Sequence, residues 1–240
     1  MYDLANFRLR DMAECAAALR KLGTDADGLF AVAERVVRLL YDNFRQVDGT
    51  ESCALVRFFK THRYDELNGE LQQFANQVLG GPPESTSIFC LTLLATVGDE
   101  PNWNMREKSA QHRAIPLASE QMLKQSPMIS QLIKQFGVDV ATVLQPNSDF
   151  LVDVEQTTFN VFHVPDARGS PFVPAQEEFV VPHRIKSVLG LGGMLPTGEL
   201  FAVILFSKVD IPRDTVEMFK TLALSIKVSI LPFVGRPLFE

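Results

Sequence analysis

Apolar residues recur every three or four positions in the first fifth of the chain and again near its end. This spacing predicts helices over residues 8–21 and 27–46, and a longer one over 214–231. The loop GTDADG between the first two helices contains Asp and Thr side chains that can cap the second. The chain therefore begins with a helical hairpin or a bent helix and ends with a helix.

The last predicted helix carries two apolar stripes. A surface helix needs one such stripe, so two indicate burial on both sides. We expect one side to pack on a sheet and the other on the N-terminal helix or a second subunit. The first stripe consists of Val216, Phe219, Leu222, Ala223, Ile226 and Ile230, and the second of Met218, Leu224, Val228 and Leu231.

Between these helices, short apolar runs rich in β-branched and aromatic residues predict strands. They lie at 53–60, 88–97 and 159–164, and the run 185–206 fits two buried strands joined by a Gly/Pro-rich hairpin. A helical pattern at 64–79 separates the first two strands. The helices and strands are therefore interleaved along the chain.

The middle of the chain is less regular. Residues 98–118 form a polar stretch that holds the only Trp, and 127–136 fits a short helix that Pro opens and Gly closes. Residues 139–154 have no clear period, although ATVLQ fits a short strand, and 165–182 is a proline-rich loop.

Composition and interleaving together predict an α/β (α+β) fold with an antiparallel core sheet. The chain has 240 residues, of which 46% are hydrophobic and 22% charged, as in soluble globular proteins. The best candidate boundary lies near residue 50. We expect residues 1–50 to be N-terminal helices packed on a sheet domain that spans residues 51–240.

Charge and apolar runs exclude several classes of partner. The net charge is −6 without a basic block, so we expect no nucleic acid partner. No run is long enough to cross a bilayer and the start lacks a signal peptide, so we expect no membrane insertion and a cytoplasmic location. Three widely spaced cysteines without a CxxC pair fit a reducing compartment, and the four histidines match no metal pattern. Haem needs one axial His, so spacing does not exclude it.

Three features near the C-terminus carry a family resemblance. They are the run SVLGLGG from Ser187, the turn LPTGE from Leu195 and the run LFAVILFS from Leu200, followed by the last helix. On these residues the C-terminal half resembles a GAF domain, the small-molecule-binding relative of PAS domains. In GAF domains they form the terminal hairpin and the helix behind the sheet. The upstream order also fits, except that a GAF domain usually has a short connection in place of the helix at 64–79.

The resemblance implies a GAF-like antiparallel sheet flanked by helices, with an N-terminal helical extension and a sensory role. The chromophore-binding cysteine and the cyclic-nucleotide signatures of some GAF branches are not identifiable, so ligand and cofactor stay unknown. We expect a small molecule to bind between the sheet and residues 98–136. The terminal helices would transmit the bound state to an output domain or a partner, with a homodimer as the expected assembly.

Three candidate ligand-binding residues lie in the polar stretch. Trp103, Arg106 and His112 recur at helical spacing, so a helix would place them on one face. Such a face can stack on a ring and pair with an anion. The alternative is a solvated helix that its Trp anchors to the core.

Two further candidates lie on predicted strands. His163 shares a face with Phe159 and Val161, where it can bind a ligand or a metal, or be a satisfied strand histidine. An inward-facing Arg57 would require an anionic ligand or a carboxylate partner. A solvated Arg57 costs less free energy, and we favour that interpretation.

Patterns for catalysis are weak, so we favour a sensor over an enzyme. There is no GxSxG motif, and Cys53 and Cys90 lie in apolar strands, where a thiol is normally inert. Two alternatives stay open. One is a ligand-free structural or dimerisation module of GAF shape, and the other is a small redox, metal-binding or haem-binding enzyme.

Overall fold

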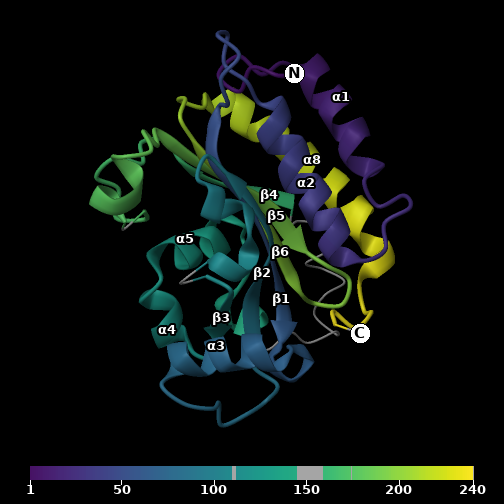
Figure 1. Ribbon diagram of the computed structural model, residues 1–240, viewed down its shortest axis with the longest axis vertical. Helices are drawn as coiled ribbons and strands as arrows, with labels where there is room; N and C mark the ends of the chain where they lie inside the picture. The colour runs from purple at the N-terminus through teal and green to yellow at the C-terminus, as the bar shows by residue number, and fades with distance from the viewer. Residues whose placement is uncertain (110–111, 145–158, 174, 240) are drawn as a thin grey trace.

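An antiparallel sheet runs through the centre of the molecule (Figure 1). The computed structural model describes residues 1–109, 112–144, 159–173 and 175–239. Six strands of these residues pair in the order β3-β2-β1-β6-β5-β4, and each neighbouring pair is antiparallel. They are β1 (Cys53–Arg63), β2 (Phe89–Gly98), β3 (Ala114–Leu117), β4 (Phe159–Val164), β5 (Ser187–Met194) and β6 (Leu200–Ser207).

The C-terminal hairpin is confirmed. β5 and β6 pair along their whole length, and every residue of both strands is buried. Burial on both faces explains why these runs lack a polar alternation. The Leu195 N–H donates to the Glu199 carbonyl across the turn, and Gly198 has a φ of 89°, a backbone conformation that favours glycine.

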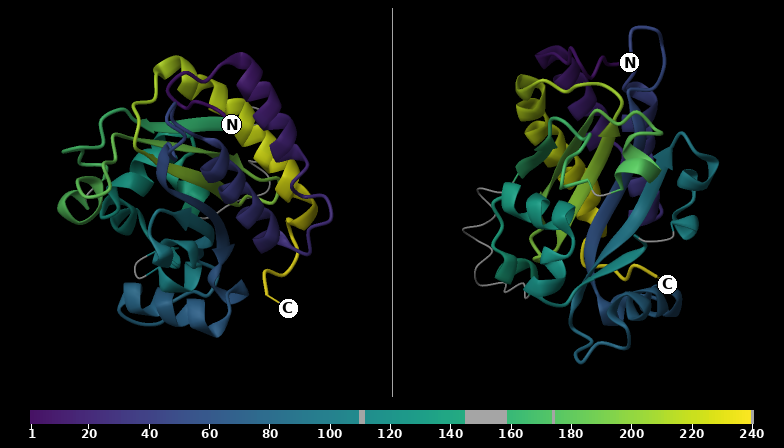
Figure 2. Two further views of the ribbon diagram at one scale, coloured as in Figure 1. Left: turned by 45° about the horizontal axis from the view of Figure 1, so that its top comes forward. Right: turned by 90° about the vertical axis from the view of Figure 1, so that its left-hand side faces the viewer.

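Three long helices cover one face of the sheet, which we call the helix face (Figure 2). α2 packs on β1 and β2, α8 packs on β4 and β5, and α1 packs on α8. This arrangement buries apolar side chains of α2 such as Leu29, Ala33 and Val36, and it buries the first predicted stripe of α8. The three helices are α1 (Leu9–Arg20), α2 (Leu29–Asn43) and α8 (Arg213–Ile230).

The second predicted stripe of α8 is mostly uncovered. Met218 is partly buried against the helix-face core, whereas Leu224 and Val228 are each 43% exposed and Leu231 is 38% exposed. Of the two partners expected for this side of α8, the N-terminal helix is therefore wrong for these three side chains, and a second subunit stays a prediction. α1 instead covers a neighbouring side of α8, where Gly23 after α1 comes so close to the Ser229 carbonyl that no Cβ would fit.

Shorter elements cover the opposite face, which we call the loop face. Apolar side chains such as Leu123, Ile133 and Phe136 form a second core there with Leu55 and Phe59 of β1. Another helix, α3 (Gly69–Leu79), packs beside β3 at one end of the sheet. The covering elements are α4 (Glu120–Lys124), α5 (Pro127–Gln135), α6 (Val140–Leu144), the 3-10 turns Pro101–Asn104 and Arg106–Lys108, and the π turn Gln176–Val180.

The antiparallel sheet flanked by helices is thus present, with the order of elements that the GAF resemblance implies. The extra helix between the first two strands is also present as α3. It begins later than predicted, because a 3-10 turn at Tyr64–Glu66 comes first and Asn68 caps the helix by accepting from the Leu71 N–H.

Three local predictions are wrong. Of the run ATVLQ, residues 141–144 lie in α6 and not in a strand. Residues 145–158 lie outside the described residues. The described residues of 98–118 include two 3-10 turns and β3 and no single helix that would put Trp103, Arg106 and His112 on one face. Gly28 precedes α2 without a side-chain cap, so the Asp and Thr residues of the preceding loop do not cap it.

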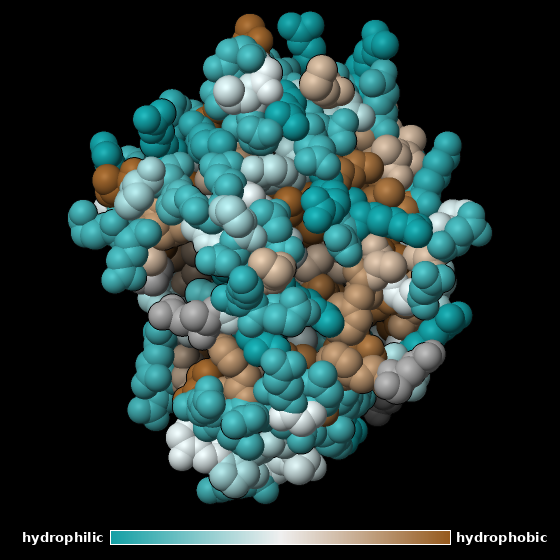
Figure 3. Space-filling view, in the orientation of Figure 1, coloured by the Kyte–Doolittle hydropathy of each residue, from teal (hydrophilic) through white to brown (hydrophobic). Residues whose placement is uncertain are grey.

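The domain boundary expected near residue 50 stays a prediction. α2, which precedes that position, packs directly on β1 and β2. No helix in the described ranges has both the length and the apolar character needed to cross a bilayer. Hydrophilic residues dominate the face of the molecule drawn in Figure 3, with hydrophobic ones visible between them.

Candidate functional site

Arg57 lies in the middle of β1, on the loop face. Leu55 and Phe59, two residues before and after Arg57, belong to the loop-face core. The adjacent residues Val56 and Phe58 belong to the helix-face core. We expected one face of this strand to be solvated. That interpretation is wrong, because both faces of the sheet are covered and Arg57 is largely buried.

Arg57 has no carboxylate partner among the described residues. Its Nε atom is buried without a hydrogen-bond partner, and so is the hydroxyl of Thr96, its cross-strand neighbour on β2. Burial lowers the pKa of Arg57 to about 10, which leaves the guanidinium protonated at neutral pH. The loop face therefore holds an unpaired positive charge beside an unpaired hydroxyl.

Trp103 belongs to an aromatic cluster on the same face. Its ring centroid lies 4.4 Å from that of His183 and 5.4 Å from that of Phe179. Gly98 on β2 makes room for the indole, since a Cβ at Gly98 would lie 2.8 Å from an atom of the Trp103 ring. Because Gly98 is two residues from Thr96, the cluster lies next to Arg57 along the sheet.

His112 is placed within reach of the same charge. The residue is exposed, yet the protein atoms around it remove enough water to lower its pKa, and the positive charge of Arg57 lowers the pKa further, to about 4. The imidazole is therefore neutral at pH 7 and can both donate and accept a hydrogen bond. Ser109, three residues earlier, has a buried hydroxyl without a partner.

Arg106 contacts the start of α2 and not the aromatic cluster around Trp103. Its guanidinium carbon is 3.7 Å from the ring centroid of Phe30 at the start of α2, and its Nε is 2.8 Å from Glu107 Oε1. A cavity of about 30 Å³ beside Arg106 has room for about one water molecule. The separation of Trp103 from Arg106 follows from the two 3-10 turns, which replace the single helix that would have aligned them.

His163 also lies away from Arg57. It pairs with Leu189 across β4 and β5, and Leu189 and Val161 belong to the helix-face core. Burial lowers the pKa of His163, and its Nε2 atom is buried without a hydrogen-bond partner. The structure therefore brings together Arg57, Trp103 and His112 from the predicted set, and places Arg106 and His163 elsewhere.

Several residues at this site were missed by the sequence analysis. Thr96 is a polar residue within an apolar run, which is a signal for a functional position, but its link to Arg57 depends on the pairing of β1 with β2. Phe179 lies in the segment 165–182 that the pattern predicted as a proline-rich loop, and His183 directly follows that segment. Their contact with Trp103 is a tertiary feature, because about 80 residues separate them along the chain.

The chemistry available elsewhere in the described chain is limited. All three cysteines are buried, and burial raises the pKa of each thiol to about 12, so none is a thiolate at neutral pH. Within the described ranges no group of His, Cys, Asp and Glu side chains is arranged to hold a metal ion. The unpaired groups around Arg57 therefore favour non-covalent binding.

No protein-family model matches the chain, and no curated protein sequence does. Solved structures with a similar course of the chain include the free methionine-R-sulfoxide reductase from Neisseria meningitidis in complex with its substrate. That match has 11% sequence identity and a TM-score of 0.49, and covers 97% of this chain and 98% of that one.

Two phytochrome structures are also similar. The photosensory core module of the Stigmatella aurantiaca phytochrome has 9% identity and a TM-score of 0.42, with 94% of this chain and 37% of that chain covered. The phycoerythrobilin-bound GAF domain of a cyanobacterial phytochrome has 12% identity and a TM-score of 0.40, with coverages of 95% and 98%. Matches this weak carry no functional assignment, which depends instead on the site.

Proposed function

We propose that this protein is a sensory domain that binds a small molecule on the loop face, at Arg57, Trp103 and His112. The observation that carries the proposal is the contrast between the two faces of the sheet. Long helices cover the helix face, whereas short turns and helices cover a loop face that combines an aromatic cluster with unpaired polar groups. The lining of small-molecule sites is typically apolar and aromatic, with a small number of polar groups that fix the ligand.

The position of Arg57 on β1 suggests how binding would be transmitted. The adjacent residues Val56 and Phe58 point to the opposite face and pack in the same core as α2 and α8. A ligand that prefers one position of β1 therefore favours one packing of these helices, and its binding shifts the populations of the alternative helix packings. A partner or an output domain would respond to that shift.

A thermal-shift screen of metabolites tests the proposal. A ligand that binds only the folded state at 100 times its Kd stabilises the protein by about 2.7 kcal/mol, so the Tm rises. Replacing the indole with Trp103→Leu should reduce the shift. The matched control is Phe239→Leu, which changes an aromatic residue that contacts Phe30 rather than the loop-face cluster. Equal losses in both variants, or no shift with any compound, would contradict the proposal.

A dimerisation module is the second candidate function. It is favoured by the exposed stripe of α8, in which Leu224, Val228 and Leu231 are spaced by four and three residues. A two-fold axis places such a stripe against its own copy, so one surface is enough to form a homodimer. The two candidates are compatible, because binding and assembly would use opposite faces of the molecule.

A further inference from the structure

We infer that the small molecule bound on the loop face carries an oxyanion, a carboxylate or a phosphate, which the Arg57 guanidinium and the Thr96 hydroxyl hold together. This inference rests on the proposed function and adds the chemical class of the ligand.

The unpaired groups around Arg57 are hydrogen-bond donors. A guanidinium has five N–H donors and no acceptor, and a threonine hydroxyl has one donor. Arg57 Nε and Thr96 Oγ1 are both buried, and neither has a partner. Buried donors are normally satisfied by the protein, by ordered water or by a ligand, and no acceptor of the described residues satisfies these two. A neutral acceptor would leave the positive charge uncompensated, whereas an oxyanion compensates it as well.

Asp99 is a carboxylate near this part of the sheet, and other side chains already engage it. Asp99, just beyond β2, accepts a hydrogen bond of 2.7 Å from the Tyr41 hydroxyl and is paired with Lys208 at 3.0 Å. Lys60 provides a contrast on the same strand as Arg57. It is 3% exposed and has a carboxylate partner, because its Nζ lies 3.0 Å from Glu199 Oε1. β1 thus pairs one buried cation within the protein and leaves the other to a ligand.

The pairing of the strands brings the two donors to one place. Arg57 and Thr96 are direct cross-strand partners, and side chains in that relation have Cβ atoms about 5 Å apart. A carboxylate or a phosphate offers two or more oxygens and can accept from both side chains at once. The neutral imidazole of His112 can add a donor, and the nearby Trp103 ring offers a surface for an apolar or aromatic ligand body.

Matched pairs of small probes test this inference. We would measure the Tm of the wild-type protein with inorganic phosphate, phenyl phosphate and benzoate, and with benzyl alcohol and benzamide as neutral controls, at constant ionic strength. Phosphate or carboxylate probes should raise the Tm, and the neutral controls should not. Comparison of the phosphate and carboxylate arms identifies which oxyanion the site prefers.

Variants of the two donors locate the effect. Arg57→Met keeps the volume and removes the charge, so it should fold and raise the Kd of the preferred anion at least about tenfold. Thr96→Val removes only the hydroxyl and leaves the charge of Arg57 in place. It should therefore raise the Kd of the anion less than Arg57→Met does. The matched control is Arg63→Met, at the exposed end of β1, where binding should be unchanged. Because the variants can differ in Tm without ligand, isothermal titration calorimetry is used to measure their Kd values directly.

The outcomes separate the inference from the proposed function. If anions stabilise the wild-type protein and Arg57→Met equally, their effect is general and the inference is overturned. If a neutral compound binds as tightly as its anionic counterpart and Trp103→Leu abolishes that binding, the inference is overturned while the proposed function stands. If no probe or metabolite shifts the Tm, both are overturned.

Discussion

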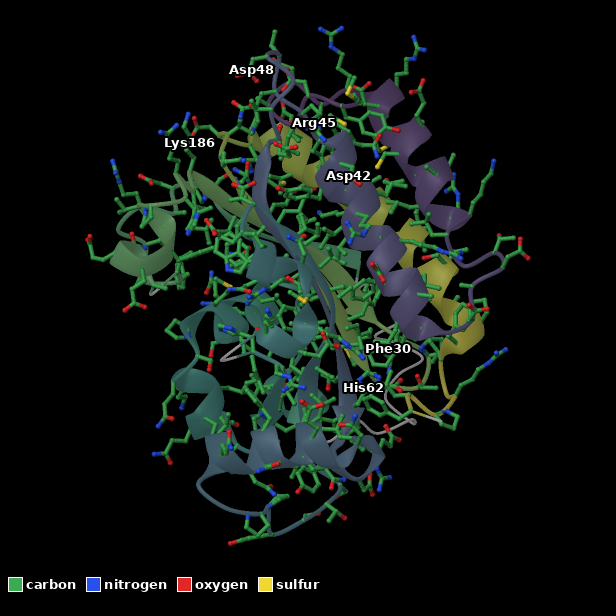
Figure 4. The ribbon with its side chains drawn as sticks, viewed as in Figure 1. Phe30, Asp42, Arg45, Asp48, His62 and Lys186 are labelled. Carbon is green, nitrogen blue, oxygen red and sulfur yellow. The ribbon has the colours of Figure 1, made fainter. Side chains whose placement is uncertain are left out.

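His62 is a buried titratable residue that the proposed site does not use (Figure 4). It is 4% exposed, and neither ring nitrogen has a hydrogen-bond partner. Burial, followed by the charge of Lys60, lowers the pKa of His62 well below 6.5. The folded protein therefore keeps this ring neutral at a pH where the unfolded chain protonates it.

This difference predicts a loss of stability in acid. Above pH 6.5 neither state protonates His62, so it contributes no pH dependence. Below pH 6.5 the unfolded state binds a proton that the folded state does not, and the free energy of unfolding falls by up to about 1.4 kcal/mol per pH unit. His112, with a pKa lowered to about 4, adds to the same trend between pH 6.5 and 4.

Urea unfolding at pH 7.5, 6.0 and 5.0 measures the effect. His62→Phe removes the titrating group and should flatten the slope relative to the wild-type protein. His112→Gln, at an exposed residue, should also flatten the slope over this range, because the unfolded chain protonates that ring below pH 6.5 and the folded protein protonates it only near pH 4. Parallel slopes for wild-type and His62→Phe would show that His62 does not cause the acid loss.

A close approach at Gly192 gives a second prediction at this scale. A Cβ on Gly192 would clash with the Phe201 carbonyl oxygen and lie 2.8 Å from the Phe136 ring. Gly192→Ala should therefore destabilise the protein by roughly 1–3 kcal/mol, as overpacking does. Gly81→Ala is the matched control, because a Cβ there meets no atom within 4 Å. Chemical denaturation should show a near-zero change for the control.

Single residues also mark the limit of what the sequence predicts at the site. Arg57 could be identified as a candidate because a charge in an apolar strand is unusual. Its burial could not, because either face of β1 looked equally apolar and the loop-face core is completed by residues such as Leu123, Ile133 and Phe136, which lie more than 60 positions away. The pairing of Arg57 with Thr96 depends on strand register, which includes a bulge after Phe58.

At the scale of elements, β1 and the β5–β6 hairpin are joined by buried polar contacts. The Thr61 hydroxyl accepts a hydrogen bond of 2.8 Å from the Leu200 N–H. Beside it, the buried ion pair of Lys60 with Glu199 links the strand to the start of β6. Burial lowers the pKa of Lys60, and the neighbouring Glu199 opposes that shift. These contacts fix the end of the hairpin against the central strand.

Breaking the ion pair from one side should be costly. Glu199→Gln leaves Lys60 as a buried charge without its partner, and such a change costs roughly 3 kcal/mol. The double variant Lys60→Met/Glu199→Gln removes the stranded charge and should recover most of the loss. Urea unfolding of both single variants and the double variant measures the coupling. Additive effects would mean that the two side chains do not interact energetically.

Elements with a strong period were predictable, and short ones were not. The helices at both ends and the strands of the C-terminal hairpin bury long runs of side chains, so their apolar patterns are long enough to recognise in the sequence. β3 and α4 have four and five residues, too few to show a period. ATVLQ was assigned wrongly because its β-branched residues favour a strand, while tertiary packing places Val143 in the loop-face core as part of α6.

At the scale of the whole molecule, the exposed stripe of α8 predicts self-association. Leu224→Glu/Val228→Glu would place two charges at the two-fold interface and should yield a monomer at concentrations where the wild-type protein is a dimer. Val47→Glu is the matched control, since Val47 is 94% exposed and lies in a loop before β1. Sedimentation equilibrium measures the mass of each. A monomeric wild-type protein would rule out this assembly.

The division of the sheet into a helix face and a loop face has a consequence for how the chain can evolve. Neighbouring residues of β1 contribute to different cores, with Arg57 on one side and Val56 and Phe58 on the other. Under the proposed function, substitutions at Arg57 or Thr96 would therefore alter ligand recognition without disturbing the residues that hold the helices. A lineage of such proteins could exchange one ligand for another while it inherits the same output.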